Sequence, residues 1–183
     1  MVFARAKLVL EDNCFEEEPS RLEIRLVGPH IPRLYNIMYE LMKSVFNVSD
    51  ADIQETTYTW GKGKEKDKFS VMWWLHKDMD VFSYFYISFK FKGQGDDRDG
   101  SCFIQVRPLL RSEYPQDTVW QRSLPYEMLR TFWHRIFYHK KREDYAEECR
   151  HSVVLYQRKL TEIYSRLKEK AVKEEEHGSP EGE

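Results

Sequence analysis

Four successive segments rich in aromatic and β-branched residues constrain the fold of this 183-residue chain most strongly. They cover residues 52–60, 68–77, 81–92 and 101–110, and short stretches containing Gly, Lys and Asp separate them. Tyr, Trp, Phe, Thr and Val favour strands, whereas Gly and Asp between such runs favour turns. The pattern therefore predicts a meander of four antiparallel strands.

Two further strands and a helix are expected before the meander. Residues 2–10 and 21–26 alternate between apolar and polar side chains, as strands with one buried face do. A helix is expected from Pro32, because the missing N–H of proline costs nothing in the first helical turn. Asn47, followed by Ser49-Asp50, is expected to end it.

The last third of the chain has a helical pattern. Ser123 is expected to cap a helix whose apolar side consists of Leu129, Phe132, Trp133, Ile136 and Phe137. Residues 138–144 are strongly polar and predict a bend or a short break. Apolar residues then recur at three- and four-residue steps, namely Ala146, Cys149, Val153, Tyr156, Leu160, Ile163 and Leu167. The seam suits a coiled coil, but Val154, Leu155 and Tyr164 widen it, so we favour packing on the chain's own sheet.

The order of these elements predicts a single α+β domain over residues 1–171. We expect a curved antiparallel sheet of about six strands, in ββαββββα order, with the long C-terminal helix packed on it. This arrangement is helix-grip-like by analogy at the level of the fold alone. A chain of this length forms one full hydrophobic core. The Glu-rich residues 172–183 are expected to form an acidic disordered tail.

Charge and hydropathy disfavour two kinds of partner. The net charge is −2, and the tail holds −4 of it, which leaves the body at +2 and argues against nucleic acid, although a local basic patch could exist. No segment approaches the roughly 18 apolar residues that cross a bilayer, so no membrane is expected. The charges within the first seven residues do not fit a secretory signal.

The cysteines indicate a reducing compartment. Cys14, Cys102 and Cys149 are odd in number and far apart in the sequence, which predicts reduced thiols and a cytoplasmic location. Few Asn residues accompany many Glu, Lys and Arg residues, a composition found in thermophilic proteins.

The pairing of the meander strands predicts a candidate site. A central turn at residues 77–80 pairs Trp73 with Tyr84, and opposed residues share a face of the sheet. Pairing Trp60 with Phe69 in one outer hairpin, and Phe91 with Cys102 in the other, gives one face an ordinary apolar core. The other face combines rings with hydroxyl, amide and guanidinium groups, and its candidate ligand-binding residues are Tyr58, Trp60, Trp73, Tyr84, Tyr86, Gln105 and Arg107.

This aromatic face should not remain bare. An exposed patch of about six rings exceeds what monomers usually tolerate, so we expect the C-terminal helix, a partner chain or a ligand to cover it. The first function hypothesis is a non-catalytic binding module that holds a small, mostly apolar ligand between this face and the C-terminal helix. Arg107 would bind a carboxylate or phosphate of an anionic or amphipathic ligand.

Other function classes rank below that hypothesis. The alternative is a homo-oligomeric structural or interaction protein that uses the aromatic face or the last helix as its interface. An enzyme is less favoured because no acid–base pair or nucleophile motif stands out, and no catalytic residue or cofactor is predicted. The Glu148–His151 spacing occurs once outside the tail, so no metal site is expected. A basic stretch from Arg130 to Arg142 is typical of a solvated helix face.

Overall fold

The computed structural model describes residues 9–15, 20–63 and 66–177. It confirms the predicted fold class, an α+β fold with a six-stranded antiparallel sheet and a long C-terminal helix. Most of the first predicted strand, residues 2–10, lies outside the described residues.

The sheet has the strand order β1-β6-β5-β4-β3, and β2 also pairs with β6. Both N-terminal strands lie along the same edge of β6, because β1 pairs with residues 109–113 and β2 with residues 101–106. The strands are β1 (Val9–Asn13), β2 (Leu22–Val27), β3 (Ile53–Gly61), β4 (Asp67–Asp78), β5 (Ser83–Gly95) and β6 (Gly100–Glu113).

The first helix begins and ends as predicted. Pro32 lies in the first turn of η1 (Ile31–Arg33), which leads directly into α1 (Leu34–Phe46). Asn47 follows α1 with a φ of 52°, a left-handed conformation that Asn tolerates better than most residues and that ends helices. The short η2 (Asp50–Asp52) then leads into β3.

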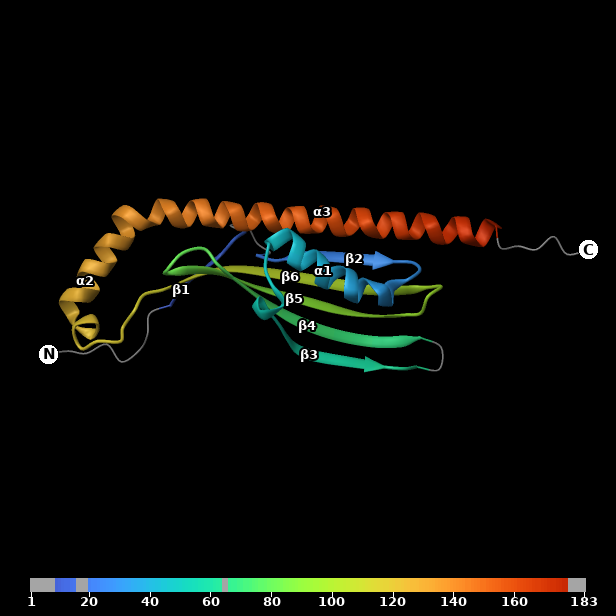
Figure 1. Cartoon of the computed structure of the whole chain (residues 1–183), viewed down its shortest axis with the longest axis horizontal. Coiled ribbons are helices and arrows are strands. Elements are labelled where there is room, and N and C mark those ends of the chain that lie inside the picture. Colours follow the sequence, from blue (N-terminus) through green and yellow to red (C-terminus); the bar gives the residue numbers. More distant parts are fainter. Residues whose placement is uncertain (1–8, 16–19, 64–65, 178–183) are drawn as a thin grey trace, which may run out of the picture.

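The C-terminal helical region bends near its start. The short η3 (Trp120–Arg122) precedes α2 (Leu124–Trp133), and the π-helical turn η4 (His134–Tyr138) joins α2 to α3 (His139–His177). Figure 1 shows α2 turning away from the line of α3 beyond the end of the sheet. The predicted break at 138–144 thus begins at Tyr138, the last residue of the observed bend. Residues 172–177 of the predicted tail belong to α3, and residues 178–183 lie outside the described residues.

One face of the sheet carries α1 and α3, and we call it the helix face (Figure 1). The C-terminal seam is buried there, with Cys149, Val153, Tyr156 and Leu160 fully inaccessible, so packing on the chain's own sheet is confirmed. We call the other side the open face, because no described helix covers it. Its side chains on β4, β5 and β6 are half-buried or exposed, apart from the buried Ser88 and Leu109.

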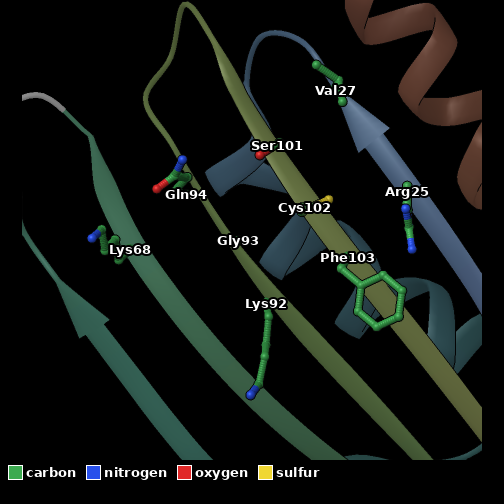
Figure 2. Close-up of a pocket in the computed structure, with 9 residues that line it drawn as sticks. All are labelled: Arg25, Val27, Lys68, Lys92, Gly93, Gln94, Ser101, Cys102 and Phe103. Carbon is green, nitrogen blue, oxygen red and sulfur yellow. The ribbon is translucent and has the colours of Figure 1, made fainter.

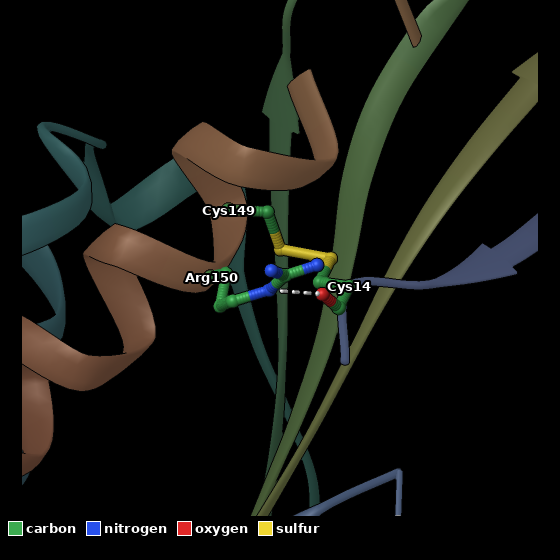
Figure 3. Close-up of a disulfide and its surroundings, with 3 residues drawn as sticks. All are labelled: Cys14, Cys149 and Arg150. Carbon is green, nitrogen blue, oxygen red and sulfur yellow. Dashed lines mark hydrogen bonds between the residues drawn. A yellow bond between two sulfur atoms is a disulfide. The ribbon is translucent and has the colours of Figure 1, made fainter. Parts of the chain in front are cut away.

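A disulfide bond between Cys14 and Cys149 attaches the segment after β1 to α3 (Figure 3). The backbone carbonyl of Cys14 also accepts a hydrogen bond from Nε of Arg150 at 3.1 Å. Cys102 is a buried free thiol. The prediction of reduced thiols is therefore wrong for two of the three cysteines, because the fold brings together residues 135 positions apart.

No helix within the described ranges is long and apolar enough to cross a membrane.

Candidate functional site

The seven predicted ligand-binding residues lie on two different faces of the sheet. The predicted register paired Trp73 with Tyr84. In the structure, Trp73 pairs with Phe89 instead. Opposed residues share a face, so Tyr84 is on the other side of the sheet from Trp73. The helix face has Tyr58, Trp60 and Trp73, and the open face has Tyr84, Tyr86, Gln105 and Arg107.

The turn between β4 and β5 causes this difference. The last pair before the turn is Asp78 with Tyr84, so an odd number of residues lies between them, whereas the prediction used an even number. Such a change transfers every side chain of one strand to the other face. The carboxylate of Asp80 stabilises the longer turn by accepting hydrogen bonds from the backbone N–H groups of Phe82 and Ser83, each at 2.8 Å.

On the helix face, Trp73 belongs to the hydrophobic core. It is fully buried, and its ring centroid lies 5.3 Å from that of Tyr35 and 6.5 Å from that of Phe91. Tyr156 of α3 is also fully buried, 5.1 Å from Phe89 between ring centroids. These rings pack in the space between sheet and helices where the ligand was predicted.

The other two helix-face candidates lie at the β3 edge of the sheet. Tyr58 and Trp60 stack with centroids 6.1 Å apart, and both contact the ring of Tyr35. The Tyr35 hydroxyl donates a hydrogen bond to Glu55 at 2.9 Å. Burial, together with this hydrogen bond, raises the pKa of Tyr35 to about 12. Ligand binding by Tyr58 and Trp60 stays a prediction.

On the open face, the aromatic side chains form a self-contained stack with Trp74 in place of Trp73. Trp74 stacks on Tyr86 with centroids 4.4 Å apart, and the Arg111 guanidinium lies over the Tyr86 ring, 4.1 Å from its centroid. The Tyr84 hydroxyl donates to Glu113 at 2.5 Å, and burial with this bond raises the pKa of Tyr84 to about 12. Arg111, which was not predicted, is therefore the guanidinium that contacts these rings.

A polar network joins the end of the sheet to the bend between α2 and α3. The carboxylate of Asp80 accepts hydrogen bonds from the hydroxyls of Tyr138 and Tyr145. It also forms an ion pair with Lys141 at 2.9 Å. The Tyr138 hydroxyl lies 2.7 Å from Oγ of Ser83. These contacts fix the direction in which the helical region leaves the sheet.

The buried guanidinium of Arg142 extends this network. It is 3% exposed, donates to Oγ of Ser112, and forms an ion pair with Asp12 of β1. Oγ of Ser112 also contacts Oγ of Ser83. A buried guanidinium is stable only when its donors are paired, so this arrangement ties α3 firmly to β1 and β6.

The segment that leads into this bend exposes an extended apolar surface. We call residues 119–138 the arm, and its nine large apolar side chains that remain exposed the arm face. These residues are Val119, Trp120, Leu124, Met128, Leu129, Phe132, Trp133, Ile136 and Phe137. Their exposed fractions run from 49% for Trp133 to 68% for Met128, in a protein whose other apolar side chains are mostly buried.

The opposite side of the arm packs against the chain itself. Arg130 is buried, forms an ion pair with Glu127, and has its guanidinium 5.5 Å from the Tyr114 ring centroid. Nδ1 of His134 lies 2.7 Å from the Tyr114 hydroxyl, and burial lowers the pKa of His134. The arm therefore holds Arg130 and His134 inward, and its exposed side carries the arm face together with the polar Thr131 and Arg135.

The sequence pattern located the arm face but not its exposure. Five of its nine members were recognised as the apolar side of a helix, and such a side is normally buried on the chain's own core. Its width, together with the polar stretch that follows it, was the one signal of a separate surface.

No protein-family model matches the chain, and no curated protein matches it either.

Proposed function

We propose that this protein is a self-associating interaction protein, and that the arm face of one copy binds the arm face of a second copy. The observation that carries the proposal is the clustering of nine exposed large apolar side chains on one short segment. Monomers rarely expose contiguous apolar patches of more than a few hundred Å². A surface of this kind marks an interface.

The exposed area matches a dimer interface. Large apolar side chains that are half to two-thirds exposed present roughly 100 Å² each, so nine of them present on the order of 900 Å². Stable complexes bury about 800 Å² per partner. Two Trp and two Phe residues are among the nine, and aromatic residues dominate the energetics of interfaces.

The spacing of the side chains suits packing between two helices. Leu124, Met128, Phe132 and Ile136 follow one another at four-residue steps, and Leu129, Trp133 and Phe137 form a second such row. Rows at this spacing form the ridges that pack into the grooves of a facing helix. Contact between identical arms gives a two-fold interface in which the same residues serve both copies.

The network at the bend supports the proposal, because it holds the arm before a partner binds. Asp80, Tyr138 and Lys141 anchor the base of the arm to the sheet. A surface fixed in this way loses less conformational entropy on binding. A cytoplasmic location remains part of the proposal, and the Cys14–Cys149 disulfide is compatible with it in hyperthermophiles, whose intracellular proteins are rich in disulfides.

Light scattering on the full chain tests the proposal through two variants. Met128→Glu combined with Phe132→Glu places two charges on the arm face, and Val154→Glu places one on the exposed side of α3 as the control. The arm variant is expected to be a monomer, whereas the unmodified chain and the control remain dimers. Equal masses for all three proteins would contradict the proposal. If the unmodified chain were a monomer and bound vesicles through Met128 and Phe132, the arm face would be a membrane-binding surface and not a dimer interface.

A further inference from the structure

The open face has a second surface at the end of the sheet opposite the arm, near the β5–β6 turn (Figure 1). The strand register places its side chains in rows that cross the sheet. One row contains Lys68, Gln94, Ser101 and Val27, and the next contains Ser70, Lys92, Phe103 and Arg25. The third contains Met72, Lys90, Gln105 and Glu23, and the fourth contains Trp74, Ser88 and Arg107.

Basic side chains outnumber acidic ones by five to one in these four rows. We call Arg25, Lys68, Lys90, Lys92 and Arg107 the basic set. Four of them are exposed and Lys90 is half-buried. Within the described part of the chain none of the five forms a salt bridge, whereas Glu23, the carboxylate in these rows, is paired with Arg21 at 2.7 Å. The charge of this surface is therefore not neutralised internally.

A shallow groove of about 540 Å³ crosses the first two rows. Figure 2 shows Lys68, Lys92 and Arg25 around it, with the Phe103 ring beside Arg25 and α1 behind the strands. The Arg25 guanidinium lies 5.8 Å from the Phe103 ring centroid. The groove thus combines an aromatic ring with cations from β2, β4 and β5.

We propose that the basic set and Phe103 form a binding surface for single-stranded nucleic acid. Side chains two residues apart on a strand are separated by roughly 7 Å, so the four rows extend over roughly 20 Å. Cations spread over such a distance match a chain of successive phosphates better than one small anion. Proteins that bind single strands combine such a basic track with an aromatic ring on which bases stack.

The uncharged side chains of these rows favour nucleic acid over an anionic membrane. Gln94, Ser101 and Gln105 present amide and hydroxyl groups beside the cations, and these groups can hydrogen-bond base edges or sugars. Membrane-surface binding needs apolar side chains that insert beside the charges. Among the described residues of the four rows, Val27 is the one large apolar side chain that is mostly exposed.

The nearly neutral body of the chain is consistent with this surface, because net charge averages over regions of opposite sign. At the other end of the open face, Arg111 is paired with Glu11 at 2.8 Å. The cations without partners are thereby concentrated at one end. Binding at this surface does not depend on self-association, since the arm lies at the opposite end of the sheet (Figure 1).

Fluorescence anisotropy with labelled single-stranded oligonucleotides of about 12 nucleotides tests the proposal on the full chain. Lys68→Glu combined with Lys92→Glu is expected to weaken binding at least about tenfold, and to lower the slope of log affinity against log salt by roughly 1.4. Arg158→Glu combined with Lys159→Glu reverses two charges on α3 as the matched control, with affinity kept within about twofold. Lys68→Arg combined with Lys92→Arg should retain binding, which separates loss of charge from loss of fold.

A second pair of probes tests the role of the ring. Phe103→Ala is expected to weaken binding of an oligothymidylate about fivefold or more, but to leave binding of an abasic strand of the same length unchanged. No binding by the unmodified chain at about 50 mM salt would overturn the proposal. So would equal losses in the two charge-reversal variants. Binding to anionic vesicles but not to the oligonucleotides, through the same lysines, would overturn it in favour of a lipid partner.

Discussion

The hydroxyl of Tyr138 lies 2.9 Å from each carboxylate oxygen of Asp80, although the two residues are 58 positions apart in the chain. Tyr138 ends the π-helical turn η4, and Asp80 lies in the turn between β4 and β5. Their contact therefore joins the bend of the helical region to the tip of the central hairpin. Lys141 of α3 binds the same carboxylate at 2.9 Å, so one acidic side chain orients both the arm and the start of α3.

Asp80→Asn tests the importance of this carboxylate for stability. The asparagine amide keeps one acceptor oxygen in place of the two of the carboxylate. Its NH₂ group would face other donors, such as the Lys141 ammonium. The free energy of unfolding is expected to fall by about 2 kcal/mol, as charged hydrogen bonds are lost. Urea denaturation measures the change, and Asp78→Asn, whose side chain is 81% exposed, is the control. A variant as stable as the control would show that other contacts fix the bend.

Stability should also depend on acid in a way that identifies Asp80. Burial alone would raise the pKa of this carboxyl, but hydrogen bonds from Lys141, the Phe82 N–H and Tyr138 outweigh it and lower the pKa to about 2. A carboxyl with a depressed pKa stabilises the fold above its unfolded pKa of about 4, and this contribution is lost as the pH falls toward about 2.

The measurement is the unfolding free energy of the unmodified chain and of Asp80→Asn between about pH 5 and pH 2. The difference between the two proteins is expected to shrink as the pH falls. A constant difference across this range would show that the charge of Asp80 contributes nothing to stability.

The sequence was sufficient for most of the fold, because the relevant signals are local. Pro32 and Asn47 mark the ends of the first helix, and Trp60 pairs with Phe69 as predicted. In the other outer hairpin Phe91 pairs with Ile104 and not with Cys102, a shift of two residues that leaves each side chain on its expected face.

The candidate site could not be predicted to the same extent, because it depends on long-range geometry. The central turn differs in length from its prediction by an odd number of residues. A single acidic side chain, Asp80, stabilises the observed turn. The difference in length reverses the faces of Trp73 and Trp74. The exposure of the arm depends on a bend at His134–Tyr138. The disulfide depends on the fold bringing Cys14 and Cys149 into contact. No local pattern specifies either of these features.

Two neighbouring tryptophans provide a direct test of the register. Trp73 is fully buried, and Trp74 is half-buried on the open face. Trp73→Ala is expected to cost about 3–5 kcal/mol of unfolding free energy, because it leaves a large cavity in the core. Trp74→Ala should cost clearly less, since water can occupy the space left by its ring. The opposite ranking in thermal or urea denaturation would support the register with the even-numbered turn.

The disulfide should make stability sensitive to reducing agents. It joins Cys14 and Cys149, which are 135 positions apart, and a crosslink over that length is expected to add about 5 kcal/mol by restricting the unfolded chain. Adding a reductant, or replacing both residues with Ser, should lower the melting temperature by similar amounts. The Ser variant should then show no response to the reductant. An unmodified chain whose melting temperature does not change on reduction would contradict this prediction.

Sedimentation equilibrium of the unmodified full chain measures self-association through the arm face without any substitution. The chain has a mass of 22.2 kDa, and we expect twice this mass at protein concentrations of about 10 μM. Dilution should give dissociation to the single-chain mass. A constant mass of one chain up to about 100 μM would contradict the claim, because the arm face would then remain exposed to water with no second copy bound.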